Sequence, residues 1–280
     1  RDLVRSRGLG DVYKRQKLAR LCPLFSGSSG NSYYIGNEKE GVLIDAGRSA
    51  KQIENALKTN GLDIMAVKAI FVTHEHIDHI KGVRVLASRH NIKVYATKGT
   101  LSALEDKGEL NGKYDYEVIS PDGNEVADME IKSFPTSHDC CESCGYVINT
   151  ADKRSLAIAT DLGYISDKVR NAVSGCDTVV IESNHDVNML QNGPYPYLLK
   201  RRVLSNSGHL SNDTCSAELA NFVENGTTRI VLAHLSEQNN FPDLAYVTSK
   251  SALNLAGMVE KKDFILTVAP KENTSGSMIF

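Results

Sequence analysis

The segment 74–79, His-Glu-His-Ile-Asp-His, holds three imidazoles and an aspartate and follows an apolar run with the character of a buried strand. If the chain stays extended there, His74 and His76 point to the same side. Asp78 and His79 then open a segment whose apolar residues have helical spacing. One strand-to-helix turn would present two pairs of ligands in two directions, which suits two metal ions better than one.

Three further polar residues end apolar runs later in the chain: His138, Asp161 and His234. Strands that end at one edge of a sheet would bring such residues together. We therefore expect two sites that share one carboxylate, with these ligands: His74, His76 and His138 for the first ion, Asp78, His79 and His234 for the second, and Asp161 between them.

Imidazole and carboxylate ligands are typical of zinc or manganese sites, and positions left open for water are typical of catalytic ones. The alternative is a surface turn that is rich in histidine by chance. Eight histidines in 280 residues make three within six a rare accident, and suitable partners follow downstream. The pattern therefore favours a catalytic site with two divalent ions.

The bulk composition limits the function only slightly. The net charge is −2 and 41% of the residues are hydrophobic. The sequence contains no apolar run of membrane-spanning length and no secretory signal pattern, so six cysteines indicate reduced thiols in a cytoplasmic protein. The segment from Arg1 to Gln16 has a net charge of +3 and poor periodicity. We expect it to be a disordered or non-native extension, with a basic nucleic-acid-binding arm as the alternative, and expect one folded domain over 17–280.

Apolar runs and turn residues predict the secondary structure. Strands are expected at 18–25, 32–35, 41–44, 67–72, 93–96, 116–119, 130–134, 145–149, 155–159, 178–181, 229–233 and 264–268. Helices are expected at 49–60, 79–90, 100–107, 165–173, 197–204, 212–224 and 241–256. The first half is rich in strands and the second half alternates helix and strand, which predicts an α/β domain of sheets covered by helices.

With these residues the chain resembles the metallo-β-lactamase-fold hydrolases, whose fold is a four-layer αββα sandwich with a dinuclear site on one edge. The segment 74–79 matches the second motif of that superfamily, and His138, Asp161 and His234 match the third, fourth and fifth. Asp45, in Leu-Ile-Asp-Ala-Gly, matches the first. The resemblance implies that Asp45 orients the ligands and does not itself bind metal.

Departures within this superfamily narrow the expected function, because the fold alone does not settle it. The β-lactamases are secreted and usually lack the bridging aspartate that Asp161 supplies here. The oxidoreductase branch has glutamate where this chain has His76. The span from Asp161 to His234 is too short for the β-CASP insertion of some nucleases, so no such insertion is expected.

Four further motifs resemble the YycJ/WalJ-type proteins, which are cytosolic bacterial members of the superfamily regarded as DNA exonucleases acting from the 5′ end. The motifs occupy residues 26–31, 182–186, 208–212 and 233–240. The resemblance implies a 5′-to-3′ exonuclease that uses two divalent metal ions, Zn or Mn, and takes a nucleic-acid substrate.

Glu182 and His209 lie in two of these motifs. Their arrangement is similar to tRNase Z, in which a Glu–His pair beside the metals supplies a proton to the leaving oxygen. The resemblance implies that His209, oriented by Glu182, is a general acid, and that Asp78 accepts a proton from the attacking water. The alternative is that Glu182 caps a strand end and His209 precedes a helix cap at Ser211. Three interpretations of His185 stay open: a substrate contact, a neighbour of a metal ion, or a residue at the start of a helix.

Two short clusters lie close to these residues in sequence. A basic run precedes His209 and consists of Lys200, Arg201 and Arg202. It is either a solvated helix face or a contact for phosphate groups. After His138 come three cysteines, expected to be small core fillers with a redox or metal-binding pair as the alternative: Cys140, Cys141 and Cys144.

Two rival functions stay open. A small-molecule hydrolase of the same fold, acting on a thioester or lactone as glyoxalase II does, would use the same metals without an acid for a nucleotide leaving group. A non-catalytic nucleic-acid-binding module would not need all seven ligands. The sequence therefore favours a phosphodiesterase, with DNA preferred as the substrate.

Overall fold

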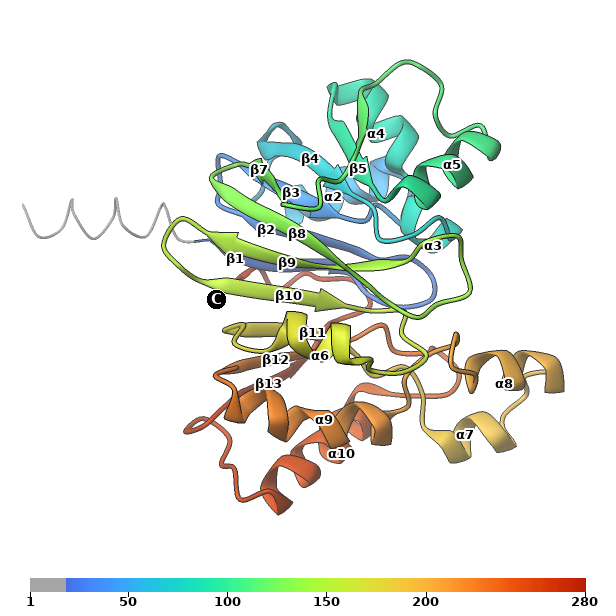
Figure 1. Cartoon of the computed structure of the whole chain (residues 1–280), viewed down its shortest axis with the longest axis vertical. Coiled ribbons are helices and arrows are strands. Elements are labelled where there is room, and N and C mark those ends of the chain that lie inside the picture. The colour runs from blue at the N-terminus through green and yellow to red at the C-terminus, as the bar shows by residue number, and fades with distance from the viewer. Residues whose placement is uncertain (1–18) are drawn as a thin grey trace, which may run out of the picture.

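In the computed structural model, which describes residues 19–280, two β-sheets face each other and helices cover both outer sides (Figure 1). The four-layer αββα sandwich that the resemblance implies is confirmed for this part of the chain. The expected extension at Arg1 to Gln16, and a domain start at residue 17, lie outside the described residues.

The first sheet has the order β14-β1-β2-β3-β4-β5-β6 and the second β13-β12-β11-β10-β9-β8-β7. The strands of the first sheet are β1 (Arg20–Phe25), β2 (Ser32–Gly36), β3 (Gly41–Ile44), β4 (Val67–Phe71), β5 (Lys93–Ala96), β6 (Tyr116–Val118) and β14 (Met278–Ile279). Those of the second are β7 (Asn124–Val126), β8 (Met129–Pro135), β9 (Cys144–Thr150), β10 (Ser155–Ala159), β11 (Thr178–Glu182), β12 (Arg229–Ala233) and β13 (Ile265–Val268). Strands β3 to β6 are parallel, and so are β10 to β13, so each set ends along one edge of its sheet.

Helices form the outer layers. The first sheet is covered by α2 (Ala50–Thr59), α4 (Val83–His90) and α5 (Lys98–Asp106). The second sheet is covered by α6 (Asp167–Val173), α9 (Asn212–Glu224) and α10 (Pro242–Leu255). Shorter elements lie in the connections: η1 (Ile64–Ala66), α3 (Ile77–Ile80), α7 (Val187–Asn192) and α8 (Tyr197–Val203). Among residues 19–280 no helix has the length and apolar character needed to cross a membrane.

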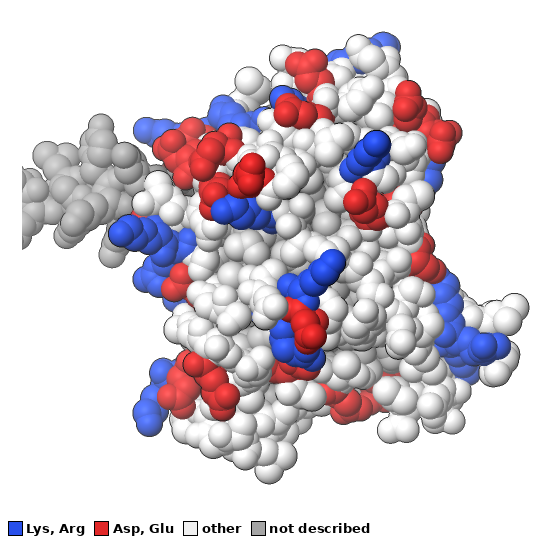
Figure 2. All heavy atoms as spheres, in the orientation of Figure 1, with Lys and Arg blue, Asp and Glu red and all other residues white. Residues whose placement is uncertain are grey.

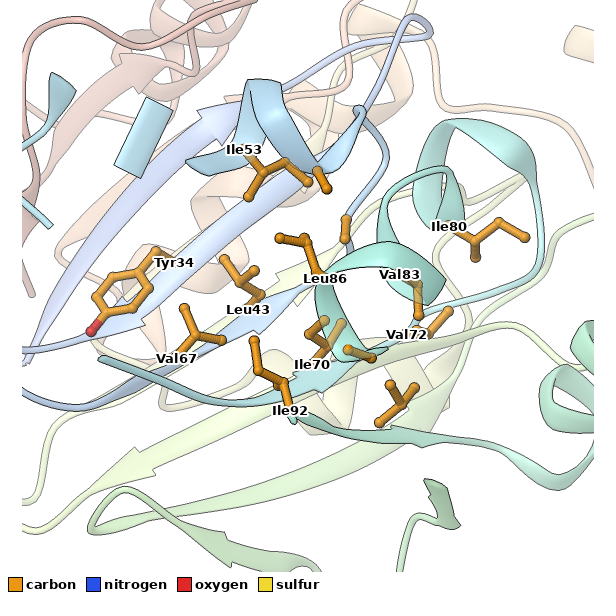
Figure 3. Packing of buried hydrophobic residues seen from close by; sticks show 14 of the residues in the cluster. Tyr34, Leu43, Ile53, Val67, Ile70, Val72, Ile80, Val83, Leu86 and Ile92 are labelled. Carbon is orange, nitrogen blue, oxygen red and sulfur yellow. The ribbon is translucent and has the colours of Figure 1, made fainter. Parts of the chain in front are cut away.

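Helix α2 shows how local sequence builds these layers. Ser49 and Gln52 form a capping box that satisfies backbone groups at its start. Its buried residues recur at helical spacing: Ala50, Ile53, Ala56 and Leu57. Figure 3 shows Ile53 packed with Leu86 of α4 above the apolar side chains of the first sheet. This packing fixes the outer face of the sheet that carries segment 74–79.

Aromatic residues fill the space between the two sheets. Phe71 at the end of β4 stacks on Tyr95 with ring centroids 4.8 Å apart and meets the edge of Tyr146 at 5.6 Å. The Tyr146 hydroxyl crosses from the second sheet to donate to the carbonyl of Val72 at 2.6 Å. The chain is therefore held from both sheets immediately before His74.

The continuous helix expected over 79–90 is wrong, because the chain forms α3 and then α4. The division falls at Gly82, whose N–H donates to the carbonyl of Ala46 at 2.8 Å. A Cβ atom on Gly82 would lie 2.4 Å from the carbonyl oxygen of Arg48. This close approach holds the loop after β3 against the turn that carries the predicted metal ligands.

The other expected elements are present, with bounds shifted by at most two residues. Four short elements had no counterpart among the expectations: η1, β7, α7 and β14. Strands of two or three residues are too short to show a period. Helix α7 buries Leu190 as its apolar contact with the core, which is too little for a helical pattern.

Candidate metal centre

Three of the predicted site residues leave strand ends with a strained backbone. Asp45 follows β3, Asp161 follows β10 and His234 follows β12, and their φ angles are 60°, 59° and 56°. Residues other than glycine rarely adopt this left-handed conformation, and surrounding structure must hold them there. All three lie at the edge where parallel strands end, so the strain is concentrated at one place in the fold.

The first cluster consists of His74, His76 and His138, whose ligand atoms lie within 4.8 Å of one another. His138 comes from the second sheet and the other two from the turn after β4. Nδ1 of His138 donates to the carbonyl of Gly208 at 3.1 Å, and its Nε2 lies 3.3 Å from Nδ1 of His76. The hydrogen bond to Gly208 therefore fixes which nitrogen of His138 faces the cluster.

The second cluster consists of Asp78, His79 and His234, again within 4.8 Å. Nδ1 of His79 lies 2.7 Å from Oδ2 of the buried Asp45, which leaves Nε2 for the cluster. Asp45 in turn accepts hydrogen bonds from the backbone N–H and the hydroxyl of Thr73, both at 2.8 Å. Asp45 thus occupies the orienting position that the resemblance implies.

Asp161 lies between the two clusters. Its Oδ1 is 3.6 Å from Nε2 of His138, and its Oδ2 is 3.3 Å from Nε2 of His79. The side chain is buried, and it also groups with His74 and His79 within ligand distance. The structure therefore gathers all seven predicted ligands, and one carboxylate reaches both clusters.

Three buried atoms of these clusters lack hydrogen-bond partners within residues 19–280: Nε2 of His74, Nε2 of His234 and Oδ2 of Asp161. A buried polar atom without a partner is costly, and a divalent cation would supply one to each. Burial and the positive charges of His79 and His138 lower the pKa of His74 well below its ordinary value. His74 is therefore neutral, as a metal ligand must be, and the donor set suits divalent metal ions.

Carboxylates surround the second cluster. Burial lowers the pKa of His79, but the charges of Asp161, Asp45 and Asp78 outweigh that effect and raise the pKa to about 9. Burial likewise acts to lower the pKa of His234, but the charge of Asp161 and the hydrogen bonds to neighbouring carboxylates outweigh it. The pKa of His234 is therefore well above its ordinary value. The carboxylates therefore attract positive charge to this position, whether protons or a cation.

Glu182 serves two histidines at once. Its Oε1 lies 2.8 Å from Nδ1 of His209 and 2.7 Å from Nδ1 of His234. Its Oε2 accepts backbone N–H groups from Leu162 at 2.8 Å and Leu210 at 3.1 Å. Burial raises the pKa of Glu182, but the charge and hydrogen bond of His209 and the contact with His234 outweigh it and lower the pKa. An ionised, immobile carboxylate thus orients both rings.

His209 and members of both clusters border a cavity of about 230 Å³. Its lining comprises Ser28, His76, Asp78, His138, Asp161, Asn184, Tyr195, Leu199, Arg202, Val203, His209, His234 and Ser236. Arg202 is held at the wall by Asp139, to which its Nη2 donates at 2.9 Å and its Nε donates in parallel. The cavity therefore combines the two clusters, the Glu182–His209 pair and a fixed guanidinium.

The remaining predicted residues do not all lie at the cavity. His185 is buried and is absent from the cavity lining. Lys200 donates to the carbonyl of Gln191 at 2.8 Å, which ties α8 to α7, and Arg201 is exposed on α8. Among the cysteines, the core-filler prediction is right for the buried Cys144 and wrong for Cys141, which is exposed because it lies in the loop before β9.

The motifs at 182–186, 208–212 and 233–240 are joined by a buried amide network. The side chain of Asn240 donates to the carbonyl of Ser183 at 2.9 Å and to Oδ1 of Asn212 at 2.8 Å. The side chain of Asn184 donates to the carbonyl of His234 at 2.8 Å. These motif residues therefore fasten three loops together next to the cavity, which Asn184 lines.

Sequence reasoning missed three residues that position the site. Thr73 contacts Asp45, and its hydroxyl also lies 3.0 Å from Nδ1 of His74. Asn31 places its side-chain amide nitrogen 3.1 Å from Nε2 of His79. Asp139 holds Arg202. Thr73 and Asp139 each adjoin a predicted ligand in sequence, and Asn31 ends the motif at 26–31, which were the available signals. The fold brings Asn31 to His79 across 48 residues of sequence.

Comparison with known proteins agrees with this geometry. Residues 41–235 match the family model described as a beta-lactamase superfamily domain. The exodeoxyribonuclease YycJ of Bacillus anthracis is 40% identical over 235 residues, covering 84% of this chain and 89% of the relative. The exodeoxyribonuclease WalJ of Streptococcus pneumoniae is 38% identical over 244 residues, covering 86% and 90%.

Solved structures show the same fold. The metallo-β-lactamase fold protein YhfI of Bacillus subtilis superimposes with a TM-score of 0.69, covering 91% of this chain and 98% of that protein at 14% identity. The identity is too low to carry more than the fold. The sequence relatives carry the finer assignment, and from both comparisons the chain belongs to the metallo-β-lactamase superfamily and, within it, to the YycJ/WalJ family.

Proposed function

We propose that this chain is a metal-dependent phosphodiesterase that removes nucleotides from the 5′ end of DNA. The observation that carries the proposal is one cavity that joins two ligand clusters, bridged by Asp161, to the Glu182–His209 pair. The names of the two YycJ/WalJ relatives support the exodeoxyribonuclease activity.

In this proposal the first ion is held by His74, His76 and His138, the second by Asp78, His79 and His234, and Asp161 is shared. Two divalent ions there would supply a nucleophilic hydroxide at neutral pH and offset charge on the phosphate oxygens. Zn and Mn both suit imidazole and carboxylate ligands. Six free cysteines support a reducing, cytoplasmic setting.

Asp78 and His209 would handle the protons. Burial raises the pKa of Asp78, but the charge of His79 and the hydrogen bond of His234 outweigh it and lower the pKa, so Asp78 is ionised and its carboxylate can accept a hydrogen bond from the attacking water. Because Nδ1 of His209 is held by Glu182, its Nε2 is the nitrogen left to donate a proton to the departing oxygen. Glu182 thus fixes the tautomer and direction of the general acid.

The test is incubation of the purified protein with DNA and RNA labelled separately at the 5′ and 3′ ends, with Zn and Mn supplied separately. We expect mononucleotides to be released first from the 5′ end of DNA. A thioester and a lactone serve as control substrates for the rival small-molecule hydrolase. Turnover of those esters without cleavage of nucleic acid would replace the proposal, and binding of DNA without any turnover would indicate a non-catalytic module.

A further inference from the structure

Helix α8 exposes an apolar surface beside the cavity. Tyr197 is 71% exposed and Leu198 is 76% exposed, while Val203 is the residue that α8 buries. Figure 1 shows α7 and α8 standing out from the sandwich at the edge of the second sheet. Contiguous exposed apolar surface on a protein marks interaction sites when it is large.

The three basic residues of α8 have different surroundings. Lys200 is tied to α7 by its bond to the carbonyl of Gln191, and Arg202 is held by Asp139 in the cavity wall. The guanidinium carbon of Arg201 lies 5.9 Å from the centre of the Tyr197 ring, and in the described part of the chain Arg201 makes no ion pair. Figure 2 shows Lys and Arg side chains gathered at the place that α8 occupies in Figure 1.

The same segment forms one wall of the metal cavity. Tyr195, Leu199 and Arg202 line that cavity, whereas Tyr197, Leu198 and Arg201 face away from it into solvent. The exposed surface is therefore continuous with the site through a single helix. A polymer whose reacting phosphate lies in the cavity can extend across α8, which a small-molecule substrate would not reach.

We propose that Tyr197, Leu198 and Arg201 form a binding surface for a single-stranded nucleic acid that leads to the metal site. The inference rests on the proposed function and deepens it, because it assigns the substrate a single-stranded stretch beside the reacting end. A base stacks on the Tyr197 ring, and the Arg201 guanidinium contacts the phosphate next to that base. An exposed aromatic ring next to a cation is the combination used for strand binding without base sequence preference.

The proposal is tested by fluorescence anisotropy with a labelled oligothymidylate whose phosphorothioate backbone resists hydrolysis, bound to the metal-loaded full-length protein. Tyr197→Ala should weaken binding about tenfold, the usual effect of losing one stacked base. Tyr197→Phe should restore the affinity because it keeps the ring. Arg201→Ala should weaken binding and reduce the slope of log affinity against log salt by about 0.7, as loss of one single-strand phosphate contact predicts.

Lys58→Ala is the matched control, since it removes an exposed charge from the end of α2, on the other sheet. It should leave the salt slope unchanged apart from a small general effect. Thermal unfolding of each variant checks that the fold is retained.

Unchanged affinity in both Tyr197→Ala and Arg201→Ala would overturn the inference. So would a chain that light scattering shows to be a dimer, if Tyr197→Ala makes it monomeric without affecting the oligonucleotide. That result would identify α8 as a contact between copies. If the wild-type protein binds the oligonucleotide through α8 but cleaves no DNA, the proposed function fails and the binding surface stands.

Discussion

At the scale of single residues, the site depends on carboxylates that each act on more than one partner. Asp45 orients His79 while it is held by Thr73, Asp161 reaches both clusters, and Glu182 binds the rings of His209 and His234. A resemblance in sequence gives such residues one role each. The coupling between roles appears only when distances are known, and it changes what substitutions should do.

We expect His209→Ala to keep both metals and to lower turnover on DNA by roughly 10²- to 10⁴-fold, the usual contribution of a positioned general acid. The loss should shrink on a nitrophenyl phosphodiester, whose leaving group departs without protonation. Kinetics on both substrates, with metal analysis of each sample, measures this. Equal losses on the two substrates, or a missing metal, would show that His209 is not the acid.

Glu182→Gln should be more damaging than His209→Ala, because Glu182 also orients His234. Metal occupancy should fall at the second cluster while the first is retained, and the nitrophenyl substrate should now lose turnover as well. Elemental analysis against the protein concentration gives the occupancy. Full occupancy in Glu182→Gln would mean that backbone packing, and not this carboxylate, fixes the ring of His234.

Asp161→Ala should lower metal content at both clusters, from about two equivalents per chain to one or fewer, because its carboxylate lies close to histidines of both clusters. Asp167→Ala is the control: it removes an exposed carboxylate that pairs with Arg170 on α6, outside the cavity lining, and should leave two equivalents bound. A single equivalent in the wild-type protein would contradict a dinuclear site.

At the scale of elements, the parallel strands β10 and β11 carry Asp161 and Glu182 near their carboxyl ends, and their opposite ends are joined by Asp177. Its Oδ2 accepts the backbone N–H of Ser155 at 2.9 Å, and its Oδ1 accepts Nη1 of Arg154 at 3.0 Å. One carboxylate at the far end thus supports the register that places two site residues. A residue immediately before a strand, such as Asp177, has a structural role that the sequence analysis did not predict.

The pH dependence of stability should report on Asp177. Partial burial raises its pKa, but the hydrogen bonds from Ser155 and Arg154 outweigh this and lower the pKa below its ordinary value. The folded state therefore gains stability from the ionised group above the ordinary pKa of about 4, and loses it as pH falls through the lower folded value. Asp177→Asn should cost about 1–2 kcal/mol at neutral pH, the usual effect of bonds to a charged group.

The difference in the free energy of unfolding between wild type and Asp177→Asn should become smaller when urea unfolding is repeated at pH values below the ordinary pKa. Asp167→Asn is the control, because Asp167 is exposed and its partner Arg170 also binds Glu218, and it should show little difference at any pH. A gap for Asp177→Asn that stays constant with pH would show that the carboxylate is not ionised in the folded state or that the loss is steric.

At the scale of the whole molecule, each cluster draws ligands from both sheets. His74, His76, Asp78 and His79 follow β4 of the first sheet, whereas His138, Asp161 and His234 follow strands of the second. The sequence predicted this set because ligand types and apolar runs are local signals. It could not predict the break at Gly82, the double role of Glu182 or the approach of Asn31, since each depends on contacts between segments that are distant in sequence.

Metal ions that join the two sheets should stabilise the whole fold. A ligand bound by the folded state alone adds RT ln(1 + [L]/Kd), about 4 kcal/mol at a thousandfold excess over Kd. We therefore expect chelation to lower the unfolding temperature markedly and added Zn or Mn to restore it in a concentration-dependent way. Calorimetry with and without chelator measures the shift. Asp161→Ala, in which both clusters are weakened, should show a much smaller response to chelator than the wild type. An equal response in the two proteins would place the stabilising metal outside the bridged site, because loss of Asp161 could not then have reduced the binding free energy that couples the sheets.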